Sequence, residues 1–75
     1  MTGFVIEYHR PTSDYRVTAF AGADGLREAV AHRVELESAV RVEDGWEVVA
    51  LSADSRDVLE HTHSRYFKGR ELIEA

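Results

Sequence analysis

The chain has 75 residues, a formal net charge of −5 and no cysteine. A chain this short forms at most one domain and buries only a little over half of its unfolded surface, and the missing cysteines exclude disulfides and thiolate metal sites. The negative charge argues against a general nucleic-acid binder, and the apolar runs are too short to span a membrane. We expect one soluble cytoplasmic domain over residues 1–69, with a C-terminal tail at 70–75. Eight of the nine basic residues are arginine, which is typical of proteins encoded by GC-rich bacterial genomes.

Two segments near the N-terminus predict a β-hairpin. Residues 4–8 (FVIEY) and 15–20 (YRVTAF) alternate in polarity and are rich in aromatic and β-branched residues, and the Pro-Thr-Ser-Asp segment 11–14 between them has turn chemistry. A four-residue loop pairs Tyr8 with Val17. This register keeps apolar side chains together on one face, whereas a five-residue loop mixes both faces, so burial favours the four-residue loop. The shared face then holds Phe4, Ile6, Tyr8, Tyr15, Val17 and Ala19.

The middle of the chain predicts a helix followed by a second hairpin. Asp24 is a favourable N-cap for a helix over about residues 25–37, with an apolar stripe at helical spacing formed by Leu26, Ala29, Val30 and Val34. The segment VRVEDGWEVVAL, residues 40–51, then fits two strands joined by the Glu-Asp-Gly loop 43–45. That register pairs Val42 with Trp46 and Val40 with Val48, and it predicts Trp46 in the core.

The last third predicts a second helix over about residues 56–68. Asp54 or Ser55 caps it, Gly69 ends it, and its stripe is Val58, Leu59, Thr62 and Tyr66. The order is therefore ββαββα. The likeness of YRVTAF before Asp24 to WEVVAL before Asp54 leaves open a duplicated unit. The predicted fold class is α+β, a four-stranded mainly antiparallel sheet with two helices packed on one face.

No motif indicates an enzyme, a bound cofactor or a metal site. His61 and His63 are two residues apart and do not face each other on a helix, so they do not share one ion. The chain has no nucleophile elbow and no glycine-rich phosphate loop. We therefore expect a non-enzymatic protein without catalytic residues, cofactors or metal ligands.

The predicted last helix and its end carry a cluster of cations. Residues 56–70 contain four cations and two carboxylates in an otherwise acidic chain. The cations are Arg56, Arg65, Lys68 and Arg70, and the carboxylates are Asp57 and Glu60. One interpretation is an anion-binding or nucleic-acid-binding accessory site. The other is that cations near a helix C-terminus complement the helix dipole without any ligand.

The second face of the predicted sheet is the leading candidate for a protein interface. Helices on one face leave the other face with an apolar cluster and a charged rim, formed by Val5, Phe20, Val49 and Leu51 with Arg16 and Glu47. Such a cluster often marks a partner site, although single exposed apolar residues are common. We predict a non-enzymatic interaction module that forms a homodimer through this face and binds an unidentified protein, without membrane contact. The alternative is the anion-binding function of the cationic segment.

Overall fold

The computed structural model describes residues 2–39 and 44–72. The elements in chain order are β1 (Thr2–His9), β2 (Asp14–Phe20), α1 (Gly25–Ala39), β3 (Trp46–Ala53), α2 (Arg56–Thr62) and the short 3-10 helix η2 (Ser64–Tyr66). The three strands form an antiparallel sheet in the order β2-β1-β3. The predicted α+β class is confirmed, but the described residues contain three strands rather than four. The predicted strand at residues 40–42 lies outside the described residues.

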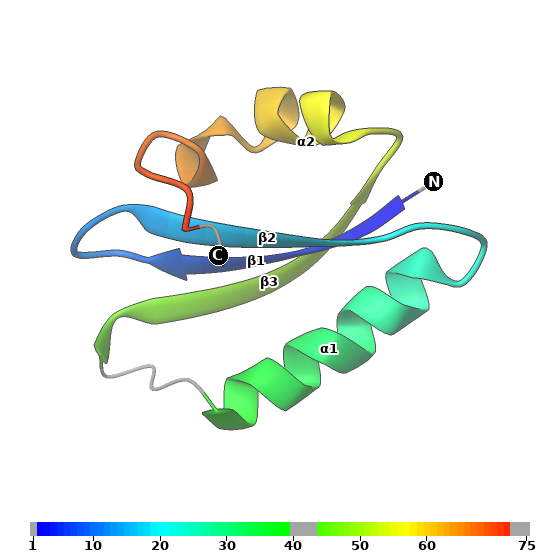
Figure 1. The fold of residues 1–75 in the computed structure, drawn as a ribbon, viewed down its shortest axis with the longest axis horizontal. Helices are drawn as coiled ribbons and strands as arrows, with labels where there is room; N and C mark the ends of the chain where they lie inside the picture. The colour runs from blue at the N-terminus through cyan, green and yellow to red at the C-terminus, as the bar shows by residue number, and fades with distance from the viewer. Residues whose placement is uncertain (1, 40–43, 73–75) are drawn as a thin grey trace.

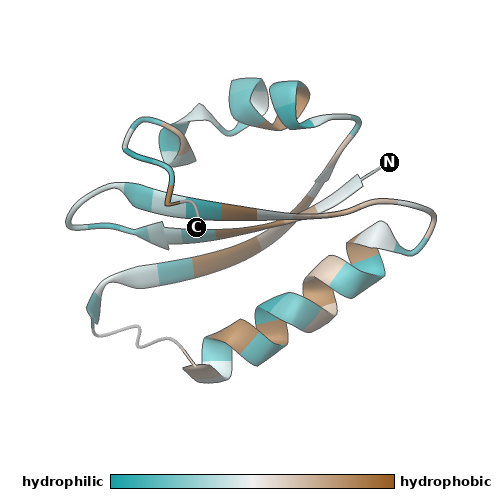
Figure 2. Cartoon of the chain, in the orientation of Figure 1, coloured by the Kyte–Doolittle hydropathy of each residue, from teal (hydrophilic) through white to brown (hydrophobic). Residues whose placement is uncertain are grey.

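The two helices cover opposite faces of the sheet (Figure 1), so the predicted packing on one face is wrong. Under α2 and η2, Phe4 and Ile6 pack with Leu59 and Tyr66. Under α1, Val5 forms a second cluster with Ala29 and Val48. The physical reason is the apolar run in the central strand, because consecutive apolar residues point to opposite faces and each face then needs a cover. Figure 2 shows this hydrophobic middle of the strands between the two helical layers.

The first hairpin forms with the predicted faces but with a register two residues away. Tyr8 pairs with Tyr15 and Ile6 with Val17, so the loop runs over residues 10–13. The Ser13 amide donates to the His9 carbonyl at 2.8 Å, and Ser13 has a φ of 63°. A shift of two residues leaves every side chain on the same face, so burial does not distinguish the two registers and the turn geometry decides.

Two glycines bring the first turn of α1 directly onto the sheet. A Cβ on Gly3 of β1 would lie 2.2 Å from the Gly25 carbonyl oxygen. Within α1, Gly25 and Ala29 are the buried residues. Small side chains therefore set both the distance and the rotation of this helix relative to the sheet.

The last helix begins where predicted and ends six residues early. The Ser55 hydroxyl accepts a hydrogen bond from the Val58 amide at 3.3 Å, which confirms Ser55 as the N-cap. The helix stops at Thr62, whose hydroxyl donates to the Val58 carbonyl at 2.9 Å, and His63 leaves helical geometry with a φ of −124°. Gly69 is not the helix stop. A Cβ there would lie 1.9 Å from the Ser13 carbonyl oxygen, so glycine allows the chain to pack against the β1–β2 turn.

The chain after η2 returns to the outer edge of β2. The Tyr15 amide donates to the Arg70 carbonyl at 3.0 Å, and the Leu72 amide donates to the Tyr15 carbonyl at 2.7 Å. Glu71 thus forms an isolated parallel bridge with Tyr15. Across residues 2–39 and 44–72, no helix combines the length and the apolar character needed to cross a membrane.

Candidate interaction surface

The residues of the predicted sheet interface do not share one surface. Val5 is 0% exposed beneath α1, and Phe20 packs against the same cluster. Val49 and Leu51 lie on the other face with Phe4 and Ile6, their partners across the β1–β3 ladder. The sequence left the pairing between the two halves of the chain undefined, and this pairing decides which apolar sets meet.

The charged rim of that predicted surface is divided in the same way. Arg16 lies opposite Glu7 on the face that α1 covers, with 3.7 Å between its Nη1 and the Glu7 Oε2. Glu47 lies opposite Tyr8 on the face that α2 and η2 cover. Arg16 and Glu47 therefore cannot rim a single patch.

The structure instead exposes a row of large apolar side chains along α1. Leu26, Val30 and Val34 are 46%, 45% and 63% exposed, and their spacing of four residues places them on successive turns of one side of the helix. The sequence predicted all three on one apolar stripe with Ala29, and of that set only Ala29 is buried. We call these three residues the α1 stripe.

The α1 stripe lies on the side of the helix that faces away from β2. The His32 ring packs against Phe20 of β2, with 5.4 Å between the ring centroids. A helix turns about 100° per residue, so His32 lies to one side of the buried Ala29 and the α1 stripe lies to the other. Since β2 and β3 are the two edges of the sheet, the stripe is on the β3 side.

The charged neighbours of the α1 stripe are paired within the helix region. Arg27 lies 3.0 Å from Asp24, and the Arg33 Nε lies 2.6 Å from a Glu37 oxygen. These pairs are exposed and contribute little stability, but each one sets a cation beside a carboxylate near the stripe. A partner surface that approaches the stripe therefore meets both of these ion pairs.

The outer edge of β3 is long and regular. Within residues 2–39 and 44–72, β3 pairs with β1 alone, through an unbroken register from Thr2↔Ala53 to His9↔Trp46. The strand, WEVVALSA, contains no proline, and Glu47 is its one charged residue. Trp46, predicted in the core, is half-buried at the start of the strand and packs against His9, with ring centroids 4.7 Å apart.

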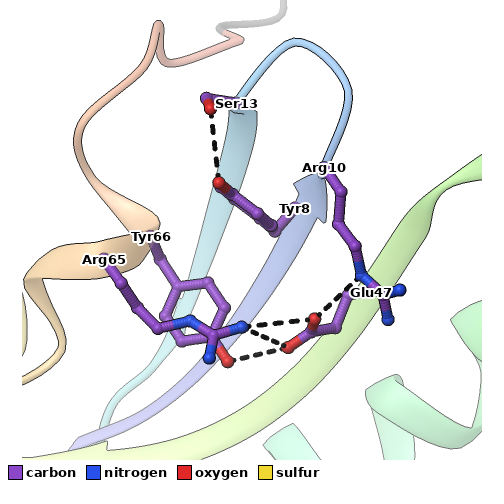
Figure 3. Close-up of polar contacts among 6 residues, drawn as sticks. All are labelled: Tyr8, Arg10, Ser13, Glu47, Arg65 and Tyr66. Atoms are coloured by element: carbon purple, nitrogen blue, oxygen red, sulfur yellow. Dashed lines mark hydrogen bonds and ion pairs between the residues drawn. The ribbon is translucent and has the colours of Figure 1, made fainter.

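A cluster of polar bonds fastens the C-terminal part of the chain to the sheet (Figure 3). The Glu47 carboxylate accepts hydrogen bonds from the Tyr66 hydroxyl at 2.8 Å, the Arg10 Nε at 3.3 Å and the Arg65 Nη2 at 3.4 Å. The donors come from the β1–β2 turn and from η2. The cluster therefore joins three separate segments around one carboxylate.

Tyr66 is the buried member of this cluster. Its ring meets the edge of Tyr8 with centroids 5.3 Å apart, and the Tyr8 hydroxyl donates to Ser13 at 3.3 Å. Burial raises the pKa of Tyr66 above its usual value, and the hydrogen bond to the Glu47 carboxylate raises it further. The phenol therefore remains protonated and donates to Glu47 at neutral pH.

The predicted anion site is partly occupied by carboxylates of the same chain. Arg56 binds Glu60 through Nε at 2.8 Å and Glu71 through both terminal nitrogens, and the bond to Glu71 is the main cause that raises the pKa of Arg56. Arg65 is held by Glu47 and lies over the Tyr66 ring. Lys68 and Arg70 are exposed. Two of the four cations, Arg56 and Arg65, are thus held by different carboxylates of the same chain.

An open hollow of about 470 Å³ lies between α1 and β2. Its lining includes Glu7, Arg16, Thr18, His32 and Leu36. Glu7 is buried, so the hollow has a carboxylate at its base beside a guanidinium group. The described ranges 2–39 and 44–72 hold no group of three or more histidine, cysteine, aspartate or glutamate residues placed to bind a metal ion.

Comparison of the chain with models of protein families, with curated proteins and with solved structures found no match. Among the described residues, the α1 stripe exposes large apolar side chains, and the outer edge of β3 has no paired strand. The sequence contains a signal for the exposed stripe. Viewed down the helix axis, the apolar positions of α1 follow one another around the circumference from Leu36 to Ala29 to Val34. This arc is wider than the apolar stripe of a helix that packs on one side only.

Proposed function

We propose that this protein is a non-enzymatic interaction module and that it works as a homodimer through the outer side of α1. The exposed α1 stripe is the observation that carries the proposal. An aligned row of large apolar side chains on three successive turns is unfavourable in water and is typical of a contact surface. Exposed apolar residues scattered singly would not support the same conclusion.

The partner that best fits this surface is a second copy of the chain. A two-fold axis across α1 sets each stripe against its own counterpart, which is the usual arrangement in homodimers. Near the stripe Asp24 pairs with Arg27 and Arg33 pairs with Glu37, so these four charges are already compensated when an identical surface approaches. A domain of this size without disulfides also gains stability from covering a second apolar area.

The decisive measurement is the mass of the protein in solution by light scattering at tens to hundreds of micromolar. We expect a dimer for the wild-type chain and a monomer for the double variant Val30→Glu with Val34→Glu. Glutamate is a good helix former, so this variant should keep its circular dichroism spectrum. The matched control is Val58→Glu, because Val58 is 43% exposed on α2, outside the stripe.

Three results would contradict the proposal. These are a monomeric mass for the wild type at every concentration, a dimer that survives both glutamates in the stripe, and a dimer that Val58→Glu dissociates equally well. A homodimer also predicts a melting temperature that rises with protein concentration, because association stabilises the folded state by mass action.

Anion or nucleic-acid binding by the cationic segment is the alternative. It has less support, since carboxylates of the same chain already engage Arg56 and Arg65. Binding through phosphates weakens steeply with salt, whereas apolar association does not. Titration with single-stranded and duplex oligonucleotides at low and high salt would separate the two functions.

A further inference from the structure

We infer that the two copies join edge to edge through β3, which would give a continuous six-stranded sheet with the two α1 helices side by side beneath it. This inference rests on the proposed homodimer and specifies its architecture. It is carried by a separate observation, the difference between the two edges of the sheet.

The edge of β2 is partly closed, whereas the edge of β3 is open among the described residues. Residues 70–72 pair with β2 at Tyr15, and β2 carries the charged residues Asp14 and Arg16. Natural sheets usually protect an edge with charges, proline, a bulge or a covering segment. β3 has eight residues in unbroken register, no proline and a single charge near its start. A long, regular and apolar edge of this kind is the preferred place for a strand of another chain to pair.

The position of the α1 stripe makes the same edge self-complementary. The stripe lies on the β3 side of α1, because His32, on the opposite side of the helix, faces Phe20 of β2. One two-fold axis perpendicular to the sheet therefore pairs β3 with its copy in antiparallel orientation and brings the two stripes together below. The pairing of the two β3 strands and the contact between the two stripes can therefore form together around the same axis.

The size of the contact supports the combination of both layers. Burying the exposed parts of three side chains recovers less free energy than the association of two chains costs. The stripe alone is therefore not enough to hold a dimer together. A strand of this length spans about 27 Å, and sheet and helix layers lie about 10 Å apart. A contact made by both layers is therefore larger than one made by the stripe alone, as the roughly 800 Å² per partner of stable interfaces requires.

Hydrogen–deuterium exchange of the β3 amides tests the inference directly. In an antiparallel edge strand, alternate amides point away from the neighbouring strand. Pairing with a second β3 would protect these amides, and we expect their exchange to slow at least about 100-fold at concentrations where the protein is a dimer. In the monomeric Val30→Glu, Val34→Glu variant the same amides should exchange rapidly, while the amides bonded to β1 remain protected in both proteins.

Each other outcome has a definite meaning. A dimer whose outward β3 amides exchange rapidly would overturn the inference and leave the proposed function standing. Protection that persists in the monomeric variant would also overturn it, because the same chain would then cover the edge, as the hairpin predicted at residues 40–42 would. A wild-type chain that is a monomer by light scattering would refute the proposed function together with the inference.

Discussion

The two helices of this protein complete the sheet in different ways. α2 has seven residues and η2 has three, yet between them they bury Leu59 and Tyr66, and they are tied to the rest of the chain through Glu47 and Glu71. α1 has fifteen residues and buries Gly25 and Ala29, while its three large residues in the stripe stay exposed. The buried residues of α2 and η2 therefore find their contacts within the same chain. The long helix has an apolar surface that the described part of the chain leaves uncovered.

Helix length and contribution to the core are therefore independent in this protein. The α2 side is fixed by a large apolar contact and by polar bonds at its margin. The α1 side is fixed by close backbone approach at Gly3 and Gly25 and by the cluster of Val5, Ala29 and Val48. The α2 side depends on large side chains, whereas the first turn of α1 depends on the absence of a side chain at Gly3, so different substitutions should damage each side.

The largest expected effect is at Leu59. Leu59→Ala removes a fully buried side chain from the cluster beneath α2, and it should lower the free energy of unfolding by about 2–5 kcal/mol. In a domain this small such a loss would leave much of the protein unfolded. Urea denaturation followed by circular dichroism measures the effect.

The matched control is Val34→Ala in the α1 stripe. In a dilute, monomeric sample this change should alter stability by less than about 0.5 kcal/mol, as is usual for surface positions. Equal losses of unfolding free energy for Leu59→Ala and Val34→Ala would show that the stripe residue contributes to the core as Leu59 does. The proposed difference between α1 and α2 would then be wrong.

The next effect is at the close approach between α1 and the sheet. Gly3→Ala places a methyl group against the Gly25 carbonyl and forces α1 away from β1, at a cost of about 1–3 kcal/mol. Amide chemical shifts should change along α1 and in the Val5–Ala29 cluster, while the signals around Leu59 change little. A Gly3→Ala protein with wild-type stability would mean that α1 does not depend on this contact.

The smallest effect is the pH dependence of Tyr66. Tyr66→Phe removes the hydrogen bond to Glu47 and should cost about 1 kcal/mol at neutral pH. The pKa of Tyr66 is raised in the folded state, so unfolded chains lose this proton first, near pH 10. The stabilisation is therefore fully present below about pH 10 and is lost as the pH rises through the folded pKa.

Urea denaturation of wild type and Tyr66→Phe between pH 7 and 11 measures this difference. We expect the stability gap between the two proteins to be constant up to about pH 10 and to close above it. Comparing the two proteins removes every contribution that they share. A gap that widens with pH would contradict the raised pKa of Tyr66.

The sequence by itself determined the α+β class, the positions of three strands, the starts of both helices and the side chains that share a face within each of these strands. Alternation assigned Phe4, Ile6 and Tyr8 to one face of β1, and Ser55 was among the two caps expected for the last helix. These features depend on neighbours within a few residues, so they can be read from local pattern. The sequence also located the first helix, which runs from Gly25 as expected.

Only the tertiary structure decided the register of the hairpin, the end of α2, the sides of the sheet that the helices cover, and the rotation of α1. A two-residue shift of register leaves the same side chains buried, so the conformation of the turn at Ser13 decides the register. The pairing of β3 with β1 separated Val49 and Leu51 from Val5 and Phe20. The contact of Gly3 with Gly25 turned Ala29 toward the sheet and the α1 stripe toward solvent. The covered faces of the sheet and the rotation of α1 depend on contacts between residues far apart in the chain, where local pattern carries no information about geometry. The hairpin register and the end of α2 depend on backbone and side-chain geometry that alternation and helical spacing do not specify.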